Sequence, residues 1–152
     1  MTSRFTMAVH ALGMLACEGE RCPDGVLSST AIARSVRTNP VVVRRVLADL
    51  RRAGLVETRR GAQGGVVLAR PPSRITLGCV WAAVNDGEPL FAGHPAGPDP
   101  RCPTGLAVAS YLADLRARAE KQLEDSLRKV TLADLRRDIT RRIPDPRGEK
   151  HA

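Results

Sequence analysis

Residues 40–52 contain the pattern that most constrains the fold of this chain. Their apolar side chains recur at spacings of three and four, which places them on one face of a helix: Val43, Val46, Leu47 and Leu50. A shorter helical pattern precedes them over residues 30–36, and two short apolar runs around a glycine-rich turn follow over residues 55–69. The order helix, turn, helix and two-stranded wing predicts a winged helix-turn-helix domain.

Residues at the ends of both predicted helices favour helix termini. Ser28 and Ser29 are N-cap candidates for the first helix, because their hydroxyl oxygens can accept hydrogen bonds from first-turn amides. Thr38 or Asn39 has this role in the second helix, and Pro40 suits its first turn, which needs no amide donor. The outer faces of the second helix are then left to Val41, Arg44, Arg45, Asp49 and Arg52.

The wing is predicted from two short strands, residues 55–59 and 66–69, with the tip at residues 60–65. The glycines of the tip would let the backbone come close to a neighbour, such as a sugar-phosphate edge of DNA. Prolines follow the second strand and end the pairing, because proline has no amide to donate.

The positive charge is concentrated in the same part of the chain. The 152 residues carry a net charge of +8, and residues 34–74 hold ten arginines against Asp49 and Glu57, so this segment accounts for all of it. Such a segment favours a polyanionic partner. Aromatic residues make up only 3% of the chain, which argues against single-strand binding on stacked aromatic rings.

The rest of the chain is predicted to be helical around one long loop. Residues 4–17 and 76–84 have helical apolar spacing, and Cys79 in the second of these helices is expected to be buried. Residues 87–103 are rich in proline and glycine. The longest pattern, residues 105–130, has a single apolar stripe. Pairing with the same helix of a second subunit would bury this stripe, and folding back onto its own domain is the alternative.

The predicted fold class is therefore mainly α with a small β-wing: a winged helix-turn-helix DNA-binding domain plus a long C-terminal dimerisation helix. We expect residues 1–86 to form the winged domain, 87–103 the loop and 104–142 the dimerisation helices. The predicted homodimer forms through residues 104–130. Residues 143–152 make a charged tail with prolines, which is expected to be disordered.

Three stretches share their order and spacing with a known family: SSTAIARSVRTNPVVVRRVLADLRRAGLV, RRGAQGGVVLARPPSRITLGCVWAAV and TLADL. The most specific pieces are TNPVVVRRVL, the RG-x-x-GG of the wing, and ARPP followed by ITL. Together they resemble the Rrf2 family of bacterial winged-helix transcription regulators, over about residues 3–135. The resemblance implies a homodimer that binds double-stranded operator DNA, usually as a repressor. It also implies a recognition helix in the major groove and a wing arginine in the minor groove.

The resemblance and the residues together give a set of candidate DNA contacts. Arginines on the second helix can reach guanine edges, and the wing arginine, Arg60, can enter a narrow minor groove. Arg37, Arg51 and Arg52, like Arg59, are better suited to phosphate contacts. The candidate DNA-binding residues are Ser28, Ser29, Thr38, Asn39, Pro40, Val41, Arg44, Arg45, Arg59, Arg60, Gly61 and Gly64.

The long loop departs from the family pattern. Cluster-binding members carry three closely spaced cysteines there, whereas this loop has Cys102, with His94 eight residues earlier. An iron–sulfur cluster needs several thiolates or comparable ligands, so we predict no metal and no cofactor. Cys102 is a candidate thiol sensor, because the neighbouring Arg101 favours a reactive thiolate. Two alternatives stay open: His94 and Cys102 as half of a metal site, and a reversible disulfide between Cys17 and Cys22.

Other function classes are poorly supported. The sequence contains no phosphate-binding glycine loop, HExxH, GxSxG or catalytically spaced His/Asp/Glu cluster, so an enzyme is not predicted. No apolar run approaches the roughly 18 residues of a membrane span, and no signal peptide is recognised. We therefore expect a cytoplasmic protein with no membrane partner. The alternative to a DNA-binding regulator is a redox- or metal-responsive protein-interaction module that uses the same basic surface.

Overall fold

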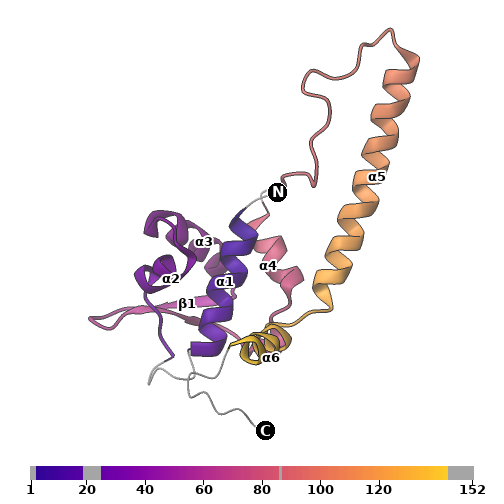
Figure 1. Cartoon of the computed structure of the whole chain (residues 1–152). Helices are drawn as coiled ribbons and strands as arrows, with labels where there is room; N and C mark the ends of the chain where they lie inside the picture. The colour runs from indigo at the N-terminus through magenta and orange to yellow at the C-terminus, as the bar shows by residue number, and fades with distance from the viewer. Residues whose placement is uncertain (1–2, 19–24, 86, 144–152) are drawn as a thin grey trace.

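The computed structural model describes residues 3–18, 25–85 and 87–143, and Figure 1 shows their arrangement. The fold class is the predicted one, mainly helical with a two-stranded antiparallel sheet. The predicted disordered tail lies outside the described residues, except for Ile143. The elements in chain order are α1 (Ser3–Glu18), α2 (Ser29–Val36), α3 (Pro40–Arg52), β1 (Val56–Arg59), β2 (Gly65–Leu68), the short 3-10 helix η1 (Pro72–Arg74), α4 (Leu77–Val84), α5 (Pro103–Arg128) and α6 (Leu132–Arg142).

The first four α-helices pack around one hydrophobic core. Leu12 of α1, Ile32 of α2 and Leu50 of α3 are fully buried in it. Phe5 and Trp81 join α1 to α4 in an edge-to-face contact, with their ring centroids 5.3 Å apart. The apolar face predicted for residues 43–50 is confirmed, since all four of its members are buried.

The ends of α2 and α3 have the predicted caps. Ser28 Oγ accepts a hydrogen bond from the amide of Ala31 at 3.1 Å. Asn39 Oδ1 accepts one from the amide of Val41 at 2.8 Å, and Pro40 is the first residue of α3. Each cap satisfies an amide that the helix itself leaves without a partner, so the sequence fixes where both helices begin.

The wing is attached to the start of α2. β1 and β2 pair along their full length, and Leu27 adds an isolated bridge to β2. The amide of Leu27 donates to the carbonyl of Val66 at 3.0 Å, and the amide of Val66 donates back at 2.8 Å. Because Leu27 directly precedes the N-cap of α2, this bridge fixes the position of the wing relative to that helix terminus.

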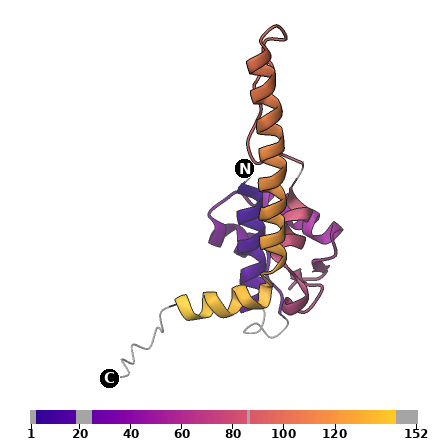
Figure 2. The same ribbon diagram turned by 90° about the vertical axis from the view of Figure 1, so that its right-hand side faces the viewer.

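The long helix α5 stands away from the rest of the chain. We call the described residues from Ser3 to Asn85 the head. Figures 1 and 2 show α5 rising beyond the head and meeting it near the C-terminal end of the helix, where α5 packs against α4. All residues of α5 are described and none is buried. α6 turns across the end of the head and packs against α1, with Leu132 fully buried.

The apolar stripe predicted for the long helix divides into two parts. Val108, Leu112 and Leu115 are exposed, whereas Leu123 and Leu127, nearer the head, are half-buried. Charged residues lie on its other faces. No helix in the described part of the chain is long and apolar enough to cross a membrane.

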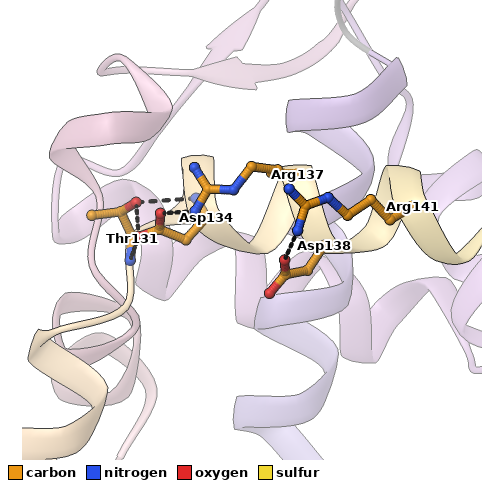
Figure 3. A network of polar contacts seen from close by, with 5 residues as sticks. All are labelled: Thr131, Asp134, Arg137, Asp138 and Arg141. Carbon is orange, nitrogen blue, oxygen red and sulfur yellow. Dashed lines mark hydrogen bonds and ion pairs between the residues drawn. The ribbon is translucent and has the colours of Figure 1, made fainter.

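A capping box starts α6, as Figure 3 shows. Thr131 Oγ1 accepts a hydrogen bond from the amide of Asp134 at 3.1 Å, and Asp134 Oδ2 accepts one from the amide of Thr131 at 3.0 Å. The Thr131 hydroxyl also donates to this carboxylate, and Arg137 lies 2.6 Å from its other oxygen. The Thr131 hydroxyl and amide, and then Arg137, lower the pKa of Asp134 to about 2. Further along, Arg141 pairs with Asp138 at 3.8 Å.

Two of the predictions about side-chain exposure were wrong. Asp49, predicted on an outer face of its helix, is buried and forms ion pairs with Arg4 of α1 and Arg52. Cys79, predicted to be buried, is exposed, because it shares the outward face of α4 with Ala82. Apolar periodicity located both helices correctly. It gives no information about the ion pairs and neighbouring residues that decide whether Asp49 and Cys79 are buried.

Candidate nucleic-acid interface

The turn between α2 and α3 places the start of α3 at the surface. Arg37 ends α2 in the left-handed conformation, with φ 57° and ψ 49°. The amide of Thr38 then donates to the carbonyl of Ala33 at 3.0 Å, which satisfies one of the last carbonyls of α2. Asn39 follows at once as the cap of α3. The connection is therefore short and hydrogen-bonded, and it fixes the angle between the two helices.

The N-terminal half of α3 exposes the predicted contact residues. Val41 is 47% exposed, and Arg44 and Arg45 are both exposed. Thr38 and Pro40 are half-buried, because they form part of the turn. The opposite face of the helix is buried in the core, so these exposed side chains are carried on a rigid support.

A cleft of about 360 Å³ lies between α3 and the wing. One wall is a face of α3, whose lining residues recur at spacings of three and four. The other wall is the wing, and residues at the start of α2 also line the cleft. Five of the lining residues were predicted as DNA or phosphate contacts: Ser28, Ser29, Arg44, Arg51 and Gly64. Ala48 and Thr58 were not predicted, since neither carries a charge that would distinguish it in the sequence. The lining residues include Ser28, Ser29, Arg44, Ala48, Arg51, Thr58 and Gly64.

The electrostatics of this cleft favour an anion. Arg44 and Arg51 place two guanidinium groups along one wall. The N-terminus of α2, which opens into the same cleft at Ser29, carries the positive end of the helix dipole. The remaining lining residues are mostly small or apolar, so the two guanidinium groups and the helix N-terminus would face a chain of phosphates that passes through the cleft.

The glycine pair of the wing is required by the chain itself. A Cβ on Gly64 would lie 2.7 Å from the carbonyl oxygen of Arg59, and one on Gly65 would lie 2.5 Å from that of Leu27. Both distances are shorter than atoms tolerate, so larger residues would open the tip or break the bridge to Leu27. The predicted reason for these glycines, approach to DNA, is thus not needed to explain them.

The wing tip projects beyond the two helices of the motif, as Figure 1 shows. Arg59 ends β1 and Arg60 begins the tip, and both are exposed. Gly61 follows them at an exposed position. The structure therefore places the predicted wing residues at the outer end of the hairpin.

A buried ion pair holds α3 against α1. The side chain of Asp49 is 7% exposed, and its two oxygens contact Arg4 and Arg52. A buried carboxylate without such partners would be strongly destabilising, and here each oxygen has one. Sequence reasoning missed this contact because Arg4 lies 45 residues before Asp49.

The loop before α5 does not bring together the ligands of a cluster. Cys102 is the N-cap of α5, and its Sγ accepts a hydrogen bond from the amide of Gly105 at 3.3 Å. His94 lines a separate small cavity of about 140 Å³ beside Phe91. Among the described residues, no three His, Cys, Asp or Glu side chains form a group that could hold a metal ion. Cys22, one half of the disulfide that was left open as an alternative, lies outside the described residues.

The sequence profile of the Rrf2 family, described as iron-dependent transcriptional regulators, matches residues 1–138. The chain belongs to the Rrf2 family. It is a DNA-binding transcriptional regulator and not an enzyme, as predicted. Within the part of the chain that the structure describes, the iron named in the family's description has no fitting ligand set, because the loop supplies a single cysteine that is engaged as a helix cap.

Relatives in sequence and structure agree with this membership. The chain is 35% identical over 135 residues to YwnA of Bacillus subtilis (strain 168), named as a candidate HTH-type transcriptional regulator, with 89% of this chain and 96% of the relative covered. Among solved structures, IscR of T. potens has a TM-score of 0.68 at 23% identity and covers 100% of this chain and 93% of its own. CymR of B. subtilis, the global cysteine regulator, has a TM-score of 0.64 at 24% identity. The match covers 90% of this chain and 95% of CymR. These two structures share the Rrf2 fold.

Proposed function

We propose that this Rrf2 protein binds a double-stranded DNA operator, sequence-specifically and as a homodimer, and acts as a repressor. The observation that carries the proposal is the cationic cleft between α3 and the wing. In a winged helix-turn-helix complex the recognition helix lies in the major groove, and the strand between the two grooves must pass between helix and wing. The cleft has the charge and the position that this strand requires.

The proposed contacts divide into positioning and reading. Ser28, Ser29 and Arg59 are assigned to phosphates, which fix the register of the protein without reading sequence. Arg60, with Gly61 and Gly64 shaping the tip around it, enters the minor groove, whose negative potential increases where A·T pairs narrow it. The residues assigned to the base edges of the major groove are Thr38, Asn39, Pro40, Val41 and Arg45. Arg44, which also lines the cleft, is assigned to a base edge or a phosphate.

The second copy of the chain is proposed to bind along α5, within residues 104–130. Val108 is 45% exposed and Tyr111 62% exposed, and Leu112 and Leu115 lie beside them on the same stripe of the helix. An isolated helix with such a stripe leaves apolar surface in water, and pairing with an identical helix removes it. The proposed dimer is consistent with the proposed repression, since two heads on a two-fold operator would exclude a polymerase from it. The proposed place of action is the cytoplasm, where such an operator lies.

The test begins with selection of bound fragments from a genomic library, followed by mobility shifts with the selected operator at about 0.15 M salt. We expect the parent protein to prefer the operator to random DNA, with an affinity that falls as salt rises. The Arg60→Ala variant should lose about 1–3 kcal/mol of binding free energy. Arg101→Ala, which removes the same charge from the loop just before α5, is the matched control and should bind like the parent.

Two results would contradict the proposal. If Arg60→Ala and the parent bind the operator with equal affinity, Arg60 does not contact the minor groove. A parent protein that binds operator and random DNA equally at this salt would instead favour the alternative, a protein-interaction module that uses the same basic surface.

A further inference from the structure

The joint between the head and α5 is formed by a close approach at Gly78. This residue lies in the first turn of α4 and is buried. A methyl group at position 78 would lie 2.6 Å from Cγ of Arg128, the last residue of α5, and 3.1 Å from its backbone N and Cα. Glycine is therefore the residue that lets α4 and α5 meet at their present distance.

Backbone pairing holds the chain on both sides of this contact. The amide of Leu77 donates to the carbonyl of Val130 at 2.9 Å, and the amide of Leu132 donates to the carbonyl of Ile75 at 2.7 Å. Residues 75–77 thus run antiparallel to residues 130–132, with an isolated bridge between their central residues. We call residues 75–78 and 128–132 the joint.

Beyond the joint, α5 is weakly held by the head. None of its residues is buried. Two of its hydrogen bonds go to the loop instead: Glu120 Oε1 accepts from the amide of Leu90 at 2.8 Å, and Arg116 donates to the carbonyl of Phe91 at 3.5 Å. The angle between α5 and the head in Figures 1 and 2 is therefore set mainly where α4 meets the end of α5.

We infer that Gly78 determines the spacing of the two operator half-sites, by setting the angle at which α5 carries the partner subunit away from the head. The inference rests on the proposed homodimer and its operator. Val108 lies 20 residues before Arg128, about 30 Å along a helix. A tilt of about 5° at the joint would move a partner held there by about 3 Å, which is comparable to the rise of one base pair, about 3.4 Å.

The experiment compares Gly78→Ala with the parent on operators whose spacer between half-sites is lengthened or shortened by one or two base pairs. A Cβ at 2.6 Å from Arg128 must push α4 and α5 apart. We expect the tightest-binding spacer to change by at least one base pair, and the affinity for the parent's spacer to fall by about tenfold, since that DNA must now be deformed. A duplex with a single half-site should be bound equally by both proteins.

Two control variants make the result specific to the joint. Gly13→Ala also adds a methyl group at a buried helical glycine, but its nearest neighbour is the flexible end of Ile139 at 3.3 Å, so the parent's spacer should remain optimal. The double variant Gly78→Ala, Arg128→Ala removes the Cγ contact and leaves the 3.1 Å backbone contacts. It should bind with an intermediate spacer preference or affinity, and it replaces the single variant if that one does not fold.

The outcomes separate the two proposals. If the parent shows a spacer optimum and a folded, dimeric Gly78→Ala protein shows the same optimum with unchanged affinity, the inference about Gly78 is overturned and the proposed function stands. If the parent binds no operator, or binds without a spacer preference, the proposed homodimeric reading is overturned and the inference falls with it.

Discussion

At the scale of single residues, Asp49 shows how a charge on the recognition helix can serve the fold. Its carboxylate lies on the inner side of α3 and is shared between Arg4 and Arg52. Arg4 belongs to the first helix, so the pair ties the N-terminus of the chain to the helix that carries the proposed base contacts. Arg52 is mostly exposed, with a side chain 77% accessible, and its pairing is worth correspondingly little.

Replacing Asp49 by Ala is expected to destabilise the head by about 3 kcal/mol, because it breaks the buried ion pair that holds α1 against α3. Urea unfolding at a fixed protein concentration measures this loss. The matched variant Arg52→Ala, which removes the exposed partner instead, should cost less than about 1 kcal/mol. Equal and small losses for both variants would mean that the buried pair contributes nothing to stability.

At the scale of elements, the start of α6 carries a carboxylate whose pKa is lowered by the capping hydrogen bonds. Thr131 and Asp134 cap the helix reciprocally, and the cap lies directly after the backbone pairing that joins the end of α5 to the head. Because α6 starts there and packs on α1, the contact between α6 and α1 also holds the joint in place. Loss of the cap should therefore loosen the C-terminal part of the chain before the head itself.

The lowered pKa of Asp134 predicts a definite pH dependence. Because the folded pKa is about 2 and the ordinary value is 3.8, the carboxylate stabilises the fold fully above about pH 4. This contribution is lost as the pH falls through 2. Thermal melts of the parent and of Asp134→Asn should differ most above pH 4 and converge near pH 2.

Asp138→Asn is the control for this pH series, since it removes the same charge one turn later from an exposed pair with Arg141. It should shift the melting temperature much less than Asp134→Asn at every pH. A difference between the parent and Asp134→Asn that stays constant from pH 7 to pH 2 would show that the capping carboxylate is not the source of the effect.

At the scale of the whole molecule, the chain consists of a compact head and a helix that leaves it. α5 has 26 residues, about 39 Å of helix, and the part of its apolar stripe far from the head faces solvent in the single chain. The cleft and the stripe lie on separate parts of the molecule, so one copy can bind DNA and a second copy at the same time. Because the two sites are separate, the angle at the joint determines how the DNA-binding cleft is oriented relative to the apolar stripe.

The variant Leu115→Asp should weaken the proposed dimer by about 3 kcal/mol, roughly a hundredfold, because it buries an unpaired carboxylate in the α5 contact. Analytical ultracentrifugation over a concentration series measures this change. Ala117→Asp introduces the same charge on another exposed face of α5 and should remain dimeric like the parent. A monomeric parent, or a Leu115→Asp protein as dimeric as the parent, would contradict pairing through this stripe.

The sequence by itself determined the secondary structure of the head and the family of the chain. The apolar spacing of residues 43–50, the caps Ser28 and Asn39, and the glycine-rich turn each act over a few residues, so local physics is enough to predict them. Order and spacing of these elements were also sufficient to recognise the winged helix-turn-helix motif and the Rrf2 family.

Tertiary structure alone decided the contacts between residues distant in the chain. The ion pair of Arg4 with Asp49, the exposure of Cys79 and the close approach of Gly78 to Arg128 join segments 45 or more residues apart or depend on which face of a helix is covered. Apolar periodicity predicts that a residue lies on a helix. Whether its side chain is buried or forms an ion pair depends on which other residues lie next to it in the folded chain. For the same reason the sequence predicted a long helix with an apolar stripe, and only the fold located the joint from which that helix leaves the head.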